Sequence, residues 1–86
     1  MESNDAARLR GYILWRLRLL ERVPARAARI HTMLLHTGKW PTLTLGRVQR
    51  QLDKLVELGV VERLPGGRSP YYRLSKEEHN AKSADA

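Results

Sequence analysis

The sequence predicts an α+β domain over residues 5–75 of the 86-residue chain, with three helices followed by a two-stranded β-hairpin. Two patterns favour this fold class: apolar residues recur at helical spacing in three successive segments, and two short β-prone runs then flank a loop rich in Pro and Gly. A hydrophobic share of 42% is adequate for one core. A chain of this length is expected to form one small domain, not two.

The first helix is expected over residues 5–22, DAARLRGYILWRLRLLER, because its acidic start and basic end suit the helix dipole. One face repeats apolar residues at three- and four-residue steps: Ala6, Leu9, Ile13, Leu17 and Leu20. Three more apolar residues, Leu14, Trp15 and Leu19, project elsewhere. They favour a second buried surface, and we expect a homodimer that uses it. The alternative is a long first helix that is wrapped by the hairpin and the second helix.

The second helix is expected over residues 24–37. Pro24 suits its first turn, where the missing N–H would have no intrahelical partner. Gly38 suits the left-handed position after its end, and GKWPT forms the connecting turn. One side of this helix carries Ala27, Ile30, His31 and Leu34, with Met33 and Leu35 at its borders.

The third helix is expected over residues 44–58, with Thr44 as its N-cap and Gly59 after its end. Its apolar stripe consists of Leu45, Val48, Leu52, Leu55 and Val56. Arg47, Arg50 and Lys54 point away from that stripe. Because the arginines stand near the start of the helix, they oppose its dipole, and intrinsic helix stability does not explain them.

The hairpin is expected over residues 60–75, where VVERL and YYRLS flank the loop PGGRSP. The remaining residues 76–86, KEEHNAKSADA, are polar and lack periodicity, so we expect this tail to be largely disordered.

The net charge of +7, from 16 basic and 9 acidic residues, favours a polyanionic partner such as nucleic acid or an anionic membrane surface. No apolar run approaches the ~20 residues of a membrane span, and the start MESNDAARLR lacks the order of a secretory signal. We therefore expect a cytoplasmic protein with no membrane partner. The absence of cysteine excludes disulfides, a thiol nucleophile and zinc fingers.

Neither an enzyme nor a metal or cofactor site is predicted. No nucleophile with an adjacent base can be assembled from the sequence, and Gly66 and Gly67 stand alone between prolines instead of forming a phosphate-binding loop. His31 and His36 are five positions apart, which does not place two imidazoles on one helix face. We expect His31 to be a partly buried packing residue.

The stretch LGRVQRQLDKLVELGVVERLPGGRSPYYRL resembles the end of a winged helix-turn-helix domain of the bacterial transcription-regulator type. The resemblance covers residues 42–75 best, although the turn GKWPTLT is longer and bulkier than is usual in that family. The matching positions are Val48, Leu52, Leu55, Leu58, Gly59, Val60, Val61, Glu62, Arg63, Tyr72 and Leu74. The resemblance implies a small, sequence-specific regulator that binds double-stranded DNA, with no evident small-molecule effector.

If the resemblance holds, the third helix enters the major groove, where Arg pairs with guanine and Gln with adenine. The residues expected to read bases are Arg47, Arg50 and Gln51. Those expected to contact phosphate are Thr42, Thr44 and Lys54. The alternative is the solvated polar face that every amphipathic helix carries.

Further contacts are expected outside the third helix. Arg68, at the tip of PGGRSP, is placed to enter a minor groove or grip a phosphate, unless it is an ordinary turn residue. Arg26 and Arg29, near the start of the second helix, are candidates for phosphate contact, and Arg63 and Arg73 join this surface if their side chains face outward. Trp40 is expected to close its turn against the core instead of wedging into DNA.

Three other functions remain open at this stage. The domain could be a protein-interaction or scaffold module that docks a partner through its first helix, or a replication or recombination accessory factor. RNA binding is disfavoured because sequence-specific RNA modules rely on stacking aromatics, and the chain has only two Trp, three Tyr and no Phe.

Overall fold

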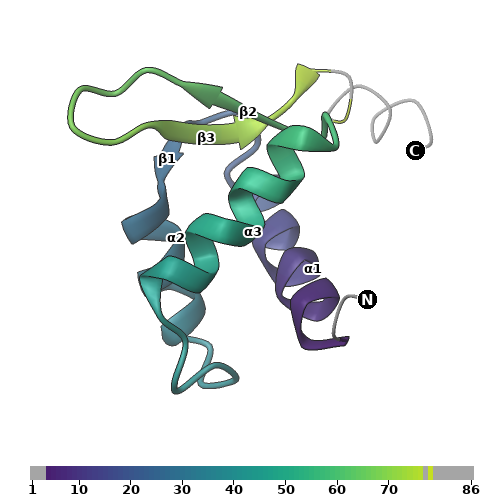
Figure 1. Cartoon of the computed structure of the whole chain (residues 1–86), viewed down its shortest axis with the longest axis vertical. Coiled ribbons are helices and arrows are strands. Elements are labelled where there is room, and N and C mark those ends of the chain that lie inside the picture. Colours follow the sequence, from purple (N-terminus) through teal and green to yellow (C-terminus); the bar gives the residue numbers. More distant parts are fainter. Residues whose placement is uncertain (1–3, 77, 79–86) are drawn as a thin grey trace.

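The computed structural model describes residues 4–76 and 78, in which three helices lie beneath a small antiparallel sheet (Figure 1). The elements in chain order are α1 (Asn4–Leu19), β1 (Ala25–Arg26), α2 (Ala27–Leu35), α3 (Leu45–Glu57), β2 (Val61–Leu64) and β3 (Tyr71–Leu74). The predicted α+β class is therefore confirmed. The expected tail lies outside the described residues, apart from Lys76 and Glu78. None of the helices in the described part is long and apolar enough to span a membrane.

The sheet has three strands in the described residues, in the order β1-β3-β2, where the sequence predicted two. Both residues of β1 pair antiparallel with Tyr71 and Tyr72 of β3. The placement of Pro24 in the first turn of a helix is therefore wrong, because α2 begins only at Ala27. A proline is tolerated just before a strand, and the partner that makes this segment a strand lies far away in the sequence.

Helix α1 ends at Leu19, three residues before the predicted end. A last helical bond joins the Leu20 N–H to the Arg16 carbonyl at 3.1 Å, after which Glu21 adopts a left-handed φ of 57°. Left-handed backbone is uncommon for a residue with a side chain and stops a right-handed helix. The chain turns here toward β1.

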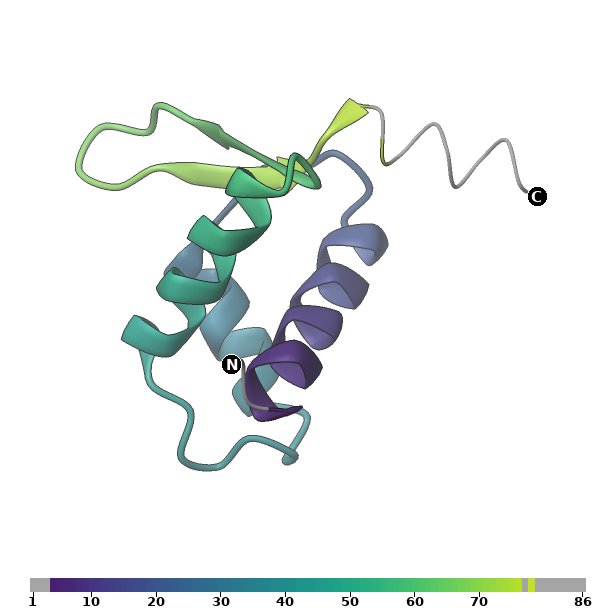
Figure 2. The ribbon, with the colours of Figure 1, turned by 45° about the vertical axis from the view of Figure 1, so that its right-hand side comes forward.

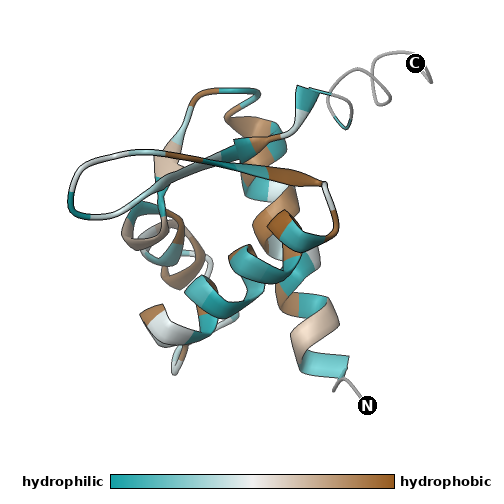
Figure 3. Cartoon of the chain, turned by 45° about the horizontal axis from the view of Figure 1, so that its top comes forward, coloured by the Kyte–Doolittle hydropathy of each residue, from teal (hydrophilic) through white to brown (hydrophobic). Residues whose placement is uncertain are grey.

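The core lies where the three helices meet the underside of the sheet. Along each helix, hydrophobic and hydrophilic stretches alternate (Figure 3), as one buried stripe per helix requires. The stripes are formed by Leu9, Ile13 and Leu17 of α1, Ile30 and Leu34 of α2, and Val48, Leu52 and Leu55 of α3. The sheet adds Val61, Tyr72 and Leu74 to the same cluster.

Two arginines hold Glu62 at the end of the sheet near the turn after α1. The Arg73 Nε donates to Glu62 Oε2 at 2.9 Å, and the Arg22 Nη2 donates to Glu62 Oε1 at 3.0 Å. The side chain of Arg73 is thus half-buried and paired with Glu62, so it does not meet the condition of facing outward that the sequence analysis set. The hydrogen bond from Arg73, with the charge of Arg22, holds the pKa of Glu62 below its ordinary value of 4.5 even though partial burial opposes this.

We expect the Glu62→Gln variant to melt at a lower temperature than the wild type near neutral pH. Because the folded-state pKa of Glu62 is lowered, its ionised form stabilises the fold above about pH 4.5, and this contribution is lost as the pH falls through the folded-state value. The difference in melting temperature should therefore shrink in acid. Thermal denaturation of both proteins across the acid range tests this, and a difference that stays constant with pH would show that the charge of Glu62 is not responsible.

Candidate nucleic-acid interface

The outer face of α3 is the main surface to which the sequence assigned a function. Thr44 caps the helix, its hydroxyl oxygen accepting the Arg47 N–H at 3.3 Å, and so fixes where the first turn begins. The buried stripe of α3 turns Arg50 and Lys54 outward, where both are exposed. Arg47 is half-buried beside them, with its guanidinium 6.0 Å from the centre of the Trp40 ring.

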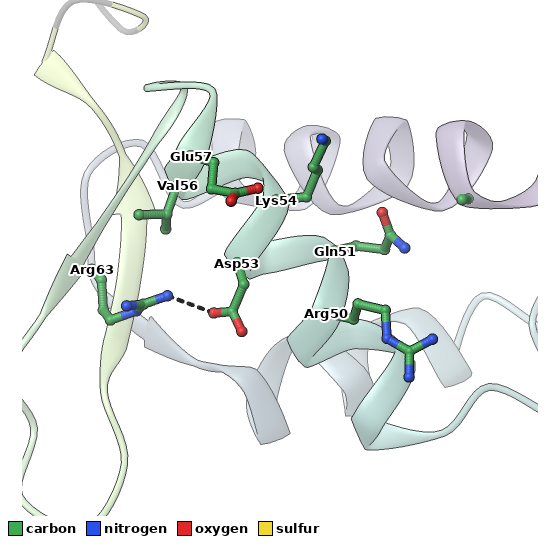
Figure 4. Close-up of a pocket in the computed structure, with 8 residues that line it drawn as sticks. Arg50, Gln51, Asp53, Lys54, Val56, Glu57 and Arg63 are labelled. Atoms are coloured by element: carbon green, nitrogen blue, oxygen red, sulfur yellow. Dashed lines mark hydrogen bonds and ion pairs between the residues drawn. The ribbon is translucent and has the colours of Figure 1, made fainter. Parts of the chain in front are cut away.

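A shallow groove of about 610 Å³ runs along this face (Figure 4). It is lined by Ala6, Arg50, Gln51, Asp53, Lys54, Val56, Glu57 and Arg63. The two acids are not equivalent: Asp53 pairs with Arg63 Nη2 at 2.6 Å, whereas Glu57 stands at the far end of the helix. The cations therefore dominate the first turns of α3, and Arg63 neutralises the nearest carboxylate.

Arg63 belongs to a network that ties the hairpin to α3. The buried Tyr72 hydroxyl accepts from Gln49 Nε2 at 2.6 Å and donates to Asp53 Oδ1 at 3.4 Å. Burial is the main reason that the pKa of Tyr72 is raised. The sequence placed Arg63 on the DNA-facing surface on the condition that its side chain faces outward, and the side chain is exposed. Its partnership with Asp53 depends on how β2 sits against α3, which no local pattern reveals.

Gln51, which the sequence assigned to base reading, forms a hydrogen bond within the protein. Its Oε1 accepts from Arg10 Nη1 at 2.7 Å, so the amide is half-buried between α3 and α1. Bidentate pairing with adenine needs that oxygen as an acceptor. An adenine would share or compete for that oxygen with Arg10, and the base-reading role of Gln51 stays a prediction. The helical wheel shows which flank of α3 is polar but not which flank lies against α1.

Arg26 is a brace of the hairpin loop, residues 65–70, and not a free cation. Its Nη1 donates to the carbonyl and the hydroxyl of Ser69 at 2.9 and 2.6 Å, and its Nη2 donates to the Gly66 carbonyl and the Tyr71 hydroxyl at 2.9 and 3.0 Å. The guanidinium also lies 4.3 Å from the centre of the Tyr71 ring. The terminal donors of Arg26 are thus engaged within the protein, and a phosphate contact through Arg26, which would compete with these bonds, stays a prediction.

The loop that Arg26 braces closes tightly on itself. A Cβ at Gly66 would lie 2.4 Å from the Ser69 carbonyl oxygen and 2.7 Å from the Tyr71 ring, so only glycine fits there without displacing backbone. Gly67 has a φ of 76°, which glycine adopts at little cost. The exposed Arg68 is thus carried on a loop of fixed shape.

We expect the Arg26→Lys variant to lose about 1–2 kcal/mol of stability, because lysine keeps the charge but lacks the planar fork that reaches both sides of the loop. Trypsin should also cleave it faster after Arg68. Thermal denaturation and limited proteolysis measure these effects. Arg29→Lys is the matched control, since Arg29 is exposed at the start of α2. If both variants behaved as the wild type, Arg26 would not act as a brace.

The remaining predicted contacts are exposed or available at the surface. Arg29, Thr42 and Arg68 are all exposed. Thr44 uses its hydroxyl oxygen as the helix cap, which leaves its proton to donate to a phosphate.

The turn before α3 is held by Trp40 and His31. Trp40 is buried and meets Tyr12 edge to face, with ring centres 5.7 Å apart, so it closes the turn as predicted. His31 is half-buried, with Nε2 lying 2.7 Å from the Leu43 carbonyl oxygen. Because a carbonyl only accepts, that nitrogen carries the proton. The long turn GKWPTLT is therefore a packed segment that sets the start of α3.

The apolar residues that the sequence assigned to a homodimer interface differ in their exposure. Trp15 and Leu19 are exposed on α1, whereas Leu14 is half-buried and packs against the core. Leu14 therefore offers less of its side chain to that surface than the other two residues do. Self-association through these residues stays a prediction.

The chain matches no model of a known protein family, and no curated protein shows significant similarity to it. Function is therefore inferred from the side chains that the fold brings together.

Proposed function

We propose that the protein binds double-stranded DNA and reads its sequence in the major groove with α3, in the manner of winged helix-turn-helix regulators of transcription. The observation that carries this proposal is the outer face of α3, where Arg50 and Lys54 are exposed and Arg47 stands beside them. A helix that presents basic side chains on an uncovered face fits the width of the major groove.

The charge distribution on α3 supports a polyanionic ligand. Cations near the N-terminal end of a helix are unfavourable for the helix itself. A phosphate backbone offsets that cost, because neutralised phosphates release counterions. Asp53, the acid closest to the basic turns, is neutralised by Arg63, which lessens its repulsion of DNA.

The hairpin loop supports a second contact with DNA, in addition to that of α3. This loop extends beyond the helices (Figure 2) and is braced by Arg26 while Arg68 remains exposed. A loop of fixed shape loses little conformational entropy when it binds, so Arg68 is suited to a minor groove or a neighbouring phosphate.

The base-reading and phosphate-contacting roles are divided between two sets of residues. Arg47 and Arg50 are proposed to donate to guanine. The residues proposed to position the protein on the phosphates are Arg29, Thr42, Thr44, Lys54 and Arg68. Single-stranded nucleic acid is less favoured, because Trp40 and Tyr72 are buried and none of the described residues that line the groove along α3 has an aromatic ring on which bases could stack.

The Gly46→Ala variant tests this docking. Gly46 lies on the exposed side of the first turn of α3, and a Cβ there would meet no atom within 4 Å. Alanine should therefore stabilise the fold by about 0.5–1 kcal/mol. We expect it nonetheless to weaken duplex binding at least about threefold, because the added methyl group would stand between α3 and the DNA.

Gly11→Ala is the matched control, because Gly11 is also an exposed helical glycine whose Cβ would meet nothing within 4 Å. It should stabilise α1 to a similar degree and leave DNA binding unchanged. Fluorescence anisotropy with short duplexes and thermal denaturation measure both effects. Equal affinities for the two variants would argue against α3 as the docking element.

A further inference from the structure

The outer side of α1 carries a stripe of large apolar side chains that the DNA-binding proposal does not use. Trp15, Leu19 and Val23 are 45%, 59% and 55% exposed. Trp15 and Leu19 lie one helical turn apart, and Val23 follows just beyond the end of the helix. Adjacent exposed hydrophobic side chains of this size mark an interaction surface more often than isolated ones do.

A shallow hollow of about 260 Å³ opens beside this stripe, lined by Arg8, Gly11, Tyr12 and Trp15. Tyr12 and Trp15 meet edge to face, with ring centres 6.2 Å apart, and form its aromatic wall. Gly11 leaves the hollow open, since a Cβ there would meet nothing within 4 Å. Glycine is unfavourable in the middle of a helix, and no packing within the described domain requires it here.

Cations surround the hollow. The guanidinium of Arg16 lies 4.5 Å from the Trp15 ring centre, that of Arg8 lies 4.9 Å from the Trp40 ring centre, and the Lys39 ammonium lies 5.3 Å from the Tyr12 ring centre. Within residues 4–76 and 78, none of the three cations forms an ion pair with a carboxylate. The hydrogen bond from Lys39 and the nearby charge of Arg8 lower the pKa of Tyr12, as expected for an electropositive surface.

We propose that this face of α1 docks an acidic segment of a partner protein, with one large apolar side chain seated in the hollow and carboxylates placed on Arg8, Arg16 and Lys39. Charge complementarity selects this occupant. A second copy of the chain would bring two basic rims together, and juxtaposed like charges oppose association.

The docking face and the groove along α3 lie on different sides of α1. Ala6 lines the groove and Arg8 lines the hollow. Because successive helical residues are rotated by about 100°, side chains two positions apart point about 200° apart around the helix axis. Both surfaces can therefore be occupied at once. The protein would then hold a partner protein on DNA, a role that rests on the proposed function, whereas the docking itself does not.

A labelled peptide in which Asp and Glu flank a single Phe is the probe, with two control peptides: one with Phe replaced by Ala, and one with the acids replaced by Asn and Gln. Anisotropy should show binding of the first peptide and at least tenfold weaker binding of both controls. The Gly11→Leu variant, which fills the hollow from an open position, should lose binding by a similar factor. Its melting temperature should not fall, and its affinity for duplex DNA should not change.

Arg50→Ala distinguishes this site from the basic face of α3, because it should leave peptide binding intact. Failure of the wild type to bind the acidic peptide, or equal binding by Gly11→Leu, would overturn the proposal while leaving DNA binding to be judged separately. A wild-type dimer that Gly11→Leu dissociates in sedimentation velocity would identify a second copy as the occupant. Binding to anionic phosphatidylserine vesicles without peptide binding would identify a membrane, and either result also overturns the proposal.

Discussion

The Arg50→Ala variant is expected to bind its preferred DNA duplex about 5- to 150-fold more weakly than the wild type, which corresponds to about 1–3 kcal/mol for a bidentate contact with guanine. Arg50 is exposed on the outward face of α3, next to the groove that the proposed DNA contact would use. Because a base contact carries sequence information, discrimination between the preferred duplex and a scrambled one should fall as well. Duplexes selected from a random pool and titrated by anisotropy give both quantities.

The matched control for Arg50 is Arg18→Ala. Arg18 is a cation of the same type, exposed on α1 and paired with Glu78 at 3.5 Å, away from α3. Its loss should leave selectivity unchanged. If the two variants lost affinity and selectivity equally, binding would depend on overall charge and α3 would not read bases.

The Leu52→Ala variant is expected to lose about 2–5 kcal/mol of folding stability. Leu52 is fully buried on the face of α3 that meets the other helices and the sheet, and truncation leaves a cavity there. A small domain typically has only about 5–15 kcal/mol of stability in total, so this loss endangers folding at ambient temperature. Urea unfolding followed by circular dichroism measures it.

Leu45→Ala is the control for Leu52, because the same substitution on the same helix removes a side chain that is 43% exposed. It should cost less than about 1 kcal/mol. Similar losses for both variants would mean that α3 is not anchored through the Leu52 face, and the outward orientation of Arg50 would then lose its support.

The helices could be predicted from the sequence because each has a local signature. The apolar stripes named for α1 and α3 contain the residues that the structure buries, such as Ile13 and Leu52, since helical periodicity alone fixes which residues share a face. Strand β1 could not be predicted. It is two residues long and exists only through its pairing with Tyr71 and Tyr72, and that pairing has no local signal.

In the candidate site, the orientation of side chains on α3 could also be predicted from local periodicity. Their contacts with distant segments could not, for the same reason as the pairing of β1. Arg50 and Lys54 are exposed as expected, because their orientation follows from the stripe of α3 itself. The intramolecular partners of Gln51 and Arg26 could not be predicted, because Arg10 and the hairpin loop come from segments about 40 positions away in the chain. Sequence patterns show which side chains leave the core, whereas tertiary packing decides which of them stay free.

The most direct test of the central claim is a titration of the wild-type protein with duplex DNA at several salt concentrations. Each phosphate neutralised by a cation contributes about −0.9 to the slope of log K against log salt. Contacts from Arg29, Lys54 and Arg68 therefore predict a slope of about −3 or steeper. Absence of duplex binding at low salt, or binding that does not weaken as salt rises, would contradict the assignment of α3 and the hairpin as a DNA-binding surface.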